Sequence, residues 1–134
     1  MTKEHINPEA LFPSVELGFS QVVAARGGKT VYLSGQTAWN AAKEIVGWGD
    51  LREQTRQACR NLQAAVEAAG GTLADVVSLR VYIVKLKRAD AGRVGEVLRE
   101  FFPRETPPAS TLIGVWSLAV SDFLIEIEAI AVVD

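Results

Sequence analysis

The chain has 134 residues, of which 49% are apolar and 22% are charged, with a net charge of −2 and an isoelectric point near 5.5. This length predicts one domain, and an acidic chain without a basic stripe counts against nucleic-acid binding. Cys59 is the only cysteine, which excludes an internal disulfide and favours a reducing compartment. The polar, proline-broken start does not resemble a signal peptide, and no apolar run approaches the ~20 residues that span a bilayer. We therefore expect a cytoplasmic protein with no membrane partner.

The N-terminal part of the chain predicts little regular structure before residue 18. We expect residues 1–17 to form a loosely structured start within a single domain that covers residues 1–134. The segment SQVVAARGGKTVYLSG then predicts two strands, joined as a hairpin at Gly27 and Gly28. A longer loop with a possible short strand follows.

The first helix has the clearest pattern in the chain. Asp50 is placed as its N-cap, with Glu53 three residues later in a capping-box arrangement. The glycines Gly70 and Gly71 end it. Its apolar stripe at helical spacing consists of Leu51, Thr55, Ala58, Leu62, Ala65 and Ala69.

The second half of the chain predicts a strand, a helix and two further strands. DVVSLRVYIVKL is typical of a central strand, and a helix begins near Asp90 and ends before Pro103. STLIGVWSLA and FLIEIEAIAVVD predict the last two strands. The order ββ-α-β-α-ββ predicts an α+β fold with both helices on one face of the sheet. Because the other face then needs a cover, we expect a second copy of the chain to supply it.

Several kinds of catalytic site are excluded by residue type. The chain has no phosphate-binding loop and no dinucleotide-binding glycine motif. His5 is the only histidine and lies in the N-terminal segment, which leaves little for histidine-based catalysis or a zinc site. Cys59, at the edge of the helical stripe, is interpreted as a small packing residue, with a reactive thiol as the alternative. Trp39, Trp48 and Trp116 are core residues, loop anchors or cleft walls, and we place Trp116 on a strand beside the last one.

Two glutamates remain as candidates for chemistry. In the last strand, Glu126 and Glu128 share one face with Leu124, Ile130 and Val132, while the other face is wholly apolar. The pair is either the solvated side of a half-buried strand or part of a site. The residue pattern alone leaves both alternatives open.

Four segments of the chain together resemble one known family. They are GFSQVV, VYLSGQT, QACRNLQAAVEAAGGTLADVVSLRVYIVKL and IEIEAIAVV. In this order and spacing they resemble the Rid/YjgF family, also called L-PSP endoribonuclease, from Gly18 to Val133. The resemblance implies a chorismate-mutase-like fold with a mixed sheet, and a homotrimer with a central barrel-like core and ligand clefts between subunits. It also implies hydrolysis of reactive enamines and imines to keto acids and ammonia, without a metal or organic cofactor.

The resemblance implies a role for several residues. The glutamate that positions the attacking water corresponds to Glu126, and Glu128 is then expected to be structural at the trimer interface. Ser34, Gly35 and Gln36 form the SGQ segment that should line the cleft. Phe19 stands where the family has a lid tyrosine, so the ring is kept and the hydroxyl is lost.

One position departs from the family pattern. Family deaminases read P-x-R-S, with the arginine binding the substrate carboxylate, but PPAST places Ala109 there. Losing such a charged contact costs about 2–5 kcal/mol of binding. The altered pocket, in which Phe19 and Ala109 join Thr111 and Trp116, predicts a larger or less anionic ligand.

Arg80, beside Tyr82 on the central strand, is the other cation considered. It either pairs with a surface or interface carboxylate, or it pairs with Glu126 or Glu128 or reaches the cleft. The first functional hypothesis is a homotrimer that hydrolyses an imine or enamine in a small-molecule cleft. The alternatives are a non-catalytic ligand-binding or protein-interaction trimer, and the ribonuclease or translation inhibitor of the family's older name, which the acidic composition disfavours.

Overall fold

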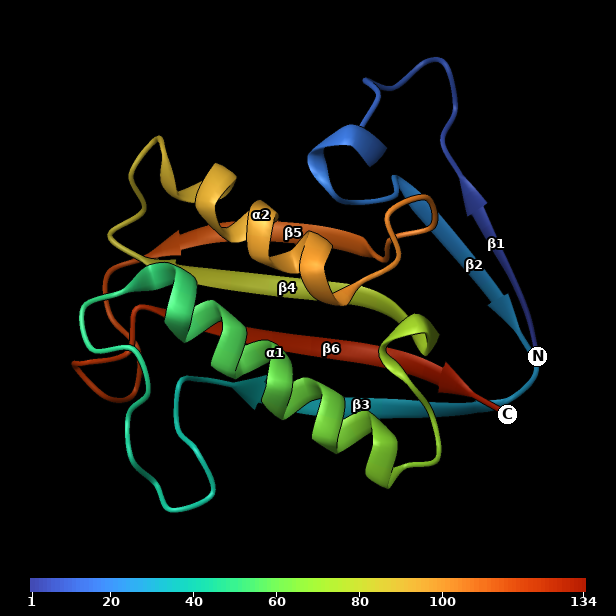
Figure 1. The fold of residues 1–134 in the computed structure, drawn as a ribbon. Helices are drawn as coiled ribbons and strands as arrows, with labels where there is room; N and C mark the ends of the chain where they lie inside the picture. Colours follow the sequence, from blue (N-terminus) through green and yellow to red (C-terminus); the bar gives the residue numbers. More distant parts are fainter.

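The computed structural model of the chain describes residues 1–134 and is built around a four-stranded sheet (Figure 1). Its strands lie side by side in the order β3 (Lys29–Gln36), β6 (Ile125–Val133), β4 (Val76–Val84) and β5 (Ala109–Val115). β4 and β5 are parallel, whereas β6 is antiparallel to both of its neighbours. The sheet is therefore mixed, and β3 and β5 are its two outer strands.

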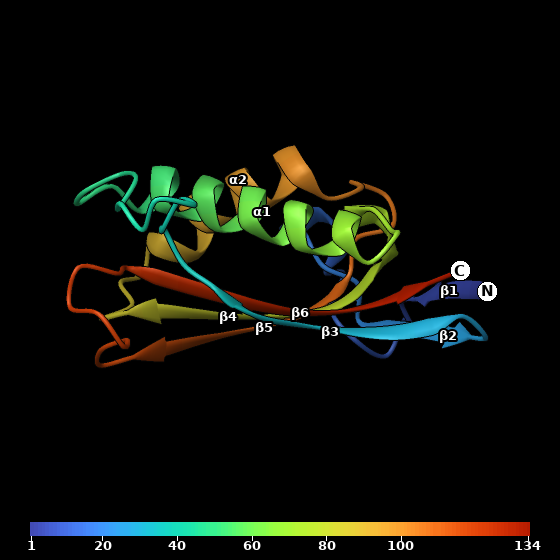
Figure 2. The ribbon, with the colours of Figure 1, turned by 90° about the horizontal axis from the view of Figure 1, so that it is seen from below.

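Two helices, α1 (Leu51–Ala68) and α2 (Asp90–Phe101), cover one face of this sheet (Figure 2). The predicted α+β architecture is confirmed. As predicted, Asp50 caps α1, because its carboxylate accepts a hydrogen bond from the Glu53 backbone N–H at 3.2 Å. The reciprocal half of the capping box is absent, since the Glu53 side chain pairs with Arg56 instead.

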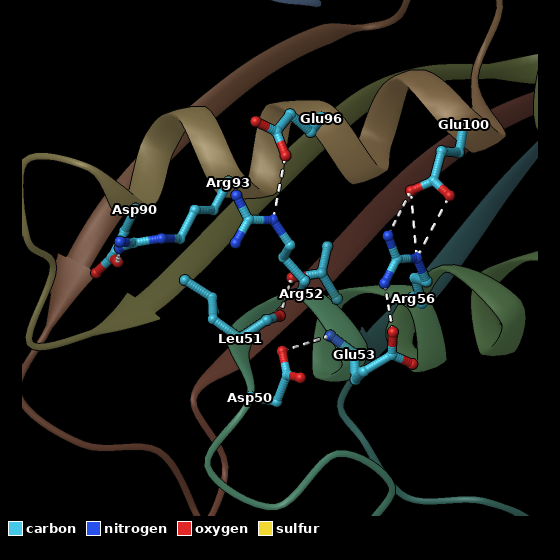
Figure 3. A network of polar contacts seen from close by, with 10 residues as sticks. Asp50, Leu51, Arg52, Glu53, Arg56, Asp90, Arg93, Glu96 and Glu100 are labelled. Carbon is cyan, nitrogen blue, oxygen red and sulfur yellow. Dashed lines mark hydrogen bonds and ion pairs between the residues drawn. The ribbon is translucent and has the colours of Figure 1, made fainter.

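Ion pairs tie the two helices together on their outer side (Figure 3). Arg52 Nε lies 3.1 Å from Glu96 Oε2, and Arg56 Nη2 lies 3.2 Å from Glu100 Oε2. These side chains are largely exposed, so they contribute little to stability compared with the apolar contacts beneath them. Neither helix is long and apolar enough to cross a membrane.

The core lies between the helices and the covered face of the sheet. Cys59 is wholly buried there, and burial raises the pKa of its thiol to about 12. This fits a packing residue rather than a reactive thiol. The strands contribute alternate residues to the core, as their period of two predicts. The largest contributions come from Leu79, Val81, Ile83, Ile125, Ile127, Ala129 and Ala131 on the strands and Leu62, Val66, Val94 and Leu98 on the helices.

The N-terminal region is more ordered than the sequence suggested. Strand β1 (Thr2–Ile6) pairs antiparallel with β2 (Val22–Arg26), and a 3-10 turn, η1 (Val15–Leu17), lies between them. The predicted hairpin of β2 with β3 is wrong, because β3 pairs with β6. Gly27 and Gly28, with φ angles of 77° and 72°, instead carry the chain from the small sheet into the large one.

Candidate functional site

The face of the sheet opposite the helices carries the predicted polar residues and no element of the chain covers it (Figure 2). Strand register places Tyr82 opposite Glu126 and Arg80 opposite Glu128. Tyr32 on β3 stands beside Ile130 on the same face, with 78% of its surface exposed. Charged, aromatic and aliphatic side chains therefore share one open surface.

Glu128 is engaged within the chain. Its carboxylate accepts a hydrogen bond from the Tyr82 hydroxyl, and this bond raises the pKa of that hydroxyl. Arg80 Nη1 lies 3.8 Å from the same carboxylate oxygen, so of the alternatives for Arg80 the structure shows a pair with Glu128. The Arg80 side chain is 64% exposed, which makes this pair weak.

Glu126, two residues earlier, forms no hydrogen bond or ion pair with any side chain of the chain. Its side chain instead lies directly against the backbone of Gly35. A methyl group added to Gly35 would lie 2.8 Å from Glu126 Cδ and 2.9 Å from Cγ, closer than real contacts allow. Only glycine at position 35 leaves room for the carboxylate where it lies. The two glutamates thus differ in surroundings although they share a strand face.

A β-bulge in β3 explains how Gly35 comes to lie there. Leu33 pairs with Ala129 and Gln36 pairs with Ile127, so β3 holds one more residue than β6 between the two pairs. Such an extra residue is left out of the hydrogen-bond ladder, and bulges are frequent beside active sites. The bulge, formed by Ser34 and Gly35, therefore places the Gly35 backbone beside the Glu126 carboxylate, while the Ser34 carbonyl accepts from the Gln36 side chain at 3.2 Å.

A cavity of about 340 Å³ opens on this face next to the bulge. Its volume is in the range of small-molecule sites. The cavity includes Ser34 of the bulge together with Arg80 and Glu128, but not Glu126 itself. The complete lining is Tyr32, Leu33, Ser34, Ser78, Arg80, Glu128, Ala129 and Ile130.

Ala109, at the expected arginine position, begins β5 at the edge of the sheet. It pairs with Ser78 of β4 and also forms a bridge with Ser20, whose N–H donates to the Pro108 carbonyl at 3.0 Å. This contact brings Phe19, the residue before Ser20, to the same edge. The structure therefore places Phe19 near Ala109, and the role of both in a ligand cleft stays a prediction.

Within one chain, Ala109 and Glu126 lie apart. Ala109 is in line with Ser78 and Ile130, whereas Glu126 is four residues further along β6 and two strands away. Strand geometry converts this offset into about 13 Å along the strands and about 10 Å across them. Within one chain these two positions are therefore too far apart for one small ligand to contact both.

The remaining predicted residues are more scattered. Thr111 is exposed beside Arg80. The placement of Trp116 beside the glutamate strand is wrong, because β5 pairs with β4 rather than with β6. Trp116 follows the end of β5 with 79% of its surface exposed, and the Lys85 ammonium lies 5.0 Å from its ring centroid. Its contact with a ligand stays a prediction.

His5 forms a contact that the sequence did not indicate. Its Nδ1 lies 3.0 Å from Ser20 Oγ, and the Ser20 hydroxyl donates to the Pro107 carbonyl at 2.5 Å. Nε2 is buried without a partner, and burial lowers the pKa of the ring. The polar segment around His5 showed no period that would have predicted β1. No three metal-ligating side chains converge anywhere in the chain.

Comparisons with known proteins agree with this fold. Residues 11–133 match the model of the Endoribonuclease L-PSP family. A 2-iminobutanoate/2-iminopropanoate deaminase of Dermatophagoides farinae is 34% identical over the whole of both chains. A RutC family protein of Pyrococcus horikoshii is 37% identical over 84% of this chain and 85% of its own.

Solved structures give the same result. YyfB of Yersinia pestis, a conserved Rid family protein described as of unknown function, superposes with a TM-score of 0.93 at 43% identity, over 99% of this chain and 100% of its own. TdcF of E. coli with bound serine gives a TM-score of 0.69 at 30% identity, over 96% and 94%. The chain therefore belongs to the Endoribonuclease L-PSP family, the Rid/YjgF family that its sequence resembles.

Proposed function

We propose that the protein is a homotrimer that hydrolyses a reactive imine or enamine to a carbonyl compound and ammonia, in clefts between its subunits. The observation that carries this proposal is the Glu126 carboxylate, which lies against the bulge at Gly35 and has no partner in the chain. A carboxylate without a hydrogen-bond or ion-pair partner is suited to hold and orient a water molecule.

The chemistry requires little beyond that water. Glu126 accepts a hydrogen bond from the water and takes its proton as the oxygen attacks the carbon of the protonated C=N bond. The resulting neutral carbinolamine carries both the hydroxyl and the amine. The proton then passes from Glu126 to the amine nitrogen, and as the C–N bond breaks, ammonia leaves and the hydroxyl gives its proton to Glu126 to form the carbonyl. Transfer of that proton to the released ammonia restores the carboxylate. An enamine enters the same route after its tautomerisation to the imine.

The separation of Ala109 from Glu126 supports a site between subunits. Phe19 and Ala109 lie at the β5 edge of the sheet, while Gly35 belongs to β3, the opposite outer strand, and Glu126 lies against it from β6. A second copy that sets its β5 edge against the β3 side of the first joins the two halves. Repetition of this contact around a ring gives each of three subunits one complete cleft.

The relatives support the reaction class and the size of the ligand. The Dermatophagoides farinae relative is named for the deamination of 2-iminobutanoate and 2-iminopropanoate, and TdcF binds serine. Alanine at position 109 and phenylalanine at position 19 make this pocket more apolar than that of family deaminases. We therefore propose a substrate range shifted toward larger or more apolar imines.

A coupled assay tests the proposal. A pyridoxal-phosphate dehydratase generates 2-aminoacrylate or 2-iminobutyrate in situ, and keto-acid release is followed with wild type, Glu126→Gln and Ala109→Arg. We expect wild type to accelerate release and Glu126→Gln to lose at least about 100-fold of that acceleration. Glu105→Gln, an exposed glutamate without contacts, is the matched control and retains full activity. Sedimentation analysis of each variant checks the trimer.

A non-catalytic trimer that binds a ligand or a protein is the second candidate, and the loss of the family arginine at Ala109 favours it. If Ala109→Arg alone accelerates release, the native protein acts on or binds a different ligand. If no variant accelerates release from either imine or from a larger homologue, the hydrolytic function is refuted and the binding function remains.

A further inference from the structure

A second cavity, of about 440 Å³, lies on the other side of β5 from the open face. The 3-10 turn η1, helix α2 and the helix-facing side of β5 enclose it, and its walls are mainly apolar. Figure 1 shows the segment that contains η1 next to α2 at the β5 edge of the sheet. Leu17, Phe19, Val94, Leu98 and Leu112 form its apolar lining.

One charged head group faces this apolar cavity without a partner. Arg99, in the last turn of α2, is half-buried and forms no ion pair or side-chain hydrogen bond in the chain. Three arginines that line two other cavities are paired: Arg52 with Glu96, Arg93 with Asp90, and Arg80 with Glu128. Figure 3 shows the first two of these pairs. Arg104, beside a small hollow near the C-terminal end of α2, is unpaired as Arg99 is, but it does not line the apolar cavity.

Two glycines, Gly95 and Gly18, lie against the Arg99 guanidinium. A methyl group added to Gly95 would lie 3.3 Å from Nη1 of Arg99, and one added to Gly18 would lie 3.5 Å from the same nitrogen. Gly95 sits inside α2, where glycine is less favourable than alanine. Gly18 has a φ of 103°, which only glycine adopts readily. A side chain at position 95 would therefore crowd the guanidinium, whereas glycine at position 18 is favoured by its backbone conformation.

The wall opposite α2 is also fixed in place. Ser14 is fully buried, and its hydroxyl donates to the Phe19 carbonyl at 2.7 Å, which holds the turn around η1. A helix dipole favours a cation in the last turn, which accounts for the sign of the charge at Arg99 but not for its enclosure beside an apolar cavity. Glu16 lines the cavity as well, but it is exposed and forms no ion pair with Arg99.

We infer that Arg99 binds the carboxylate of a ligand with an apolar chain in this cavity. The guanidinium fork matches the two oxygens of a carboxylate, and the apolar walls receive the chain. The cavity and Glu126 lie on opposite sides of the sheet, so this binding is independent of the proposed hydrolysis.

Calorimetric titration with 4-methylpentanoate and with its amide, 4-methylpentanamide, tests the binding. We expect the carboxylate to bind wild type at least about 10-fold more tightly than the amide. Arg99→Ala and Arg99→Gln should weaken carboxylate binding about 10- to 100-fold and leave amide binding unchanged. Arg88→Ala, an exposed arginine outside both cavities, should bind as wild type does.

Backbone amide shifts provide an independent measurement on the folded protein. Addition of 4-methylpentanoate should perturb the amides of Phe19, Gly95 and Ser110 in wild type and not in Arg99→Gln. Equal carboxylate affinity in wild type and both Arg99 variants would overturn the inference. So would dissociation of the oligomer by Arg99→Ala without any change in affinity, because the cavity would then be a subunit contact.

The two proposals can fail separately. If Glu126→Gln retains 4-methylpentanoate binding but loses imine hydrolysis, both proposals hold. If no imine is hydrolysed while carboxylate affinity still depends on Arg99, the proposed function fails and the binding site stands.

Discussion

The two faces of the large sheet differ in burial and polarity although the same strands form both. On β6, Ile125 and Ile127 are fully buried under the helices, whereas Glu126 and Glu128, between and after them, are half-exposed on the open face. The covered face is completed by the chain itself and stabilises it. The open face is left with positioned polar groups and no cover. One face therefore accounts for the fold of the chain, and the other leaves polar side chains on an open surface.

The largest expected effect comes from the covered face. Ile127→Ala removes fully buried atoms between both helices and the sheet, and we expect it to lower the free energy of unfolding by about 2–5 kcal/mol. Urea denaturation followed by circular dichroism measures this loss. Ile130→Ala, on the open face of the same strand, should cost the chain clearly less and weaken assembly more. The reverse order would show that the faces do not divide stability and assembly in this way.

A smaller effect is expected from the polar pair on the open face. Tyr82→Phe removes the hydroxyl that donates to Glu128 and leaves the ring in place. Because the site is accessible to water, we expect a loss of stability of at most roughly a third of that of Ile127→Ala. Arg80→Ala, which breaks only the exposed 3.8 Å pair, should have less effect still. A loss as large as that of Ile127→Ala would mean that the open face also stabilises the single chain.

The smallest effect concerns pH and the small sheet. The unfolded chain protonates His5 near its ordinary pKa of 6.5, but burial lowers that pKa in the folded chain. Between the two pKa values the unfolded state binds more protons, so the free energy of unfolding decreases as the pH falls. Urea denaturation between about pH 7.5 and about pH 5 should show this slope in wild type, and a shallower one in His5→Gln. Equal slopes would mean that His5 titrates freely.

The covered face could be predicted from the sequence because its signals are local and repeated. The Asp50 cap, the stripe of α1 and the alternation of β6 each follow from a fixed period or a neighbouring residue. The hairpin prediction at Gly27 and Gly28 failed because two glycines indicate a turn without saying which strand pairs next.

The open face could be predicted only in part. Glu126 and Gly35 were selected by family resemblance, whereas their contact depends on a bulge for which the sequence carries no period. The sequence did not indicate Arg99 as a binding residue, because only the three-dimensional structure shows that its guanidinium lies beside a cavity without an ion-pair partner. A sequence gives the positions of charged residues, but it does not show which of them form ion pairs in the folded chain.

The bulge in β3 also sets a limit on how this family member could be stabilised. A regular strand at Ser34 and Gly35 would complete the ladder to β6 and make a better-paired sheet. It would also turn away the backbone that lies against Glu126. If Glu126 hydrolyses an imine as proposed, selection for thermal resistance and selection for activity act in opposite directions at these two residues.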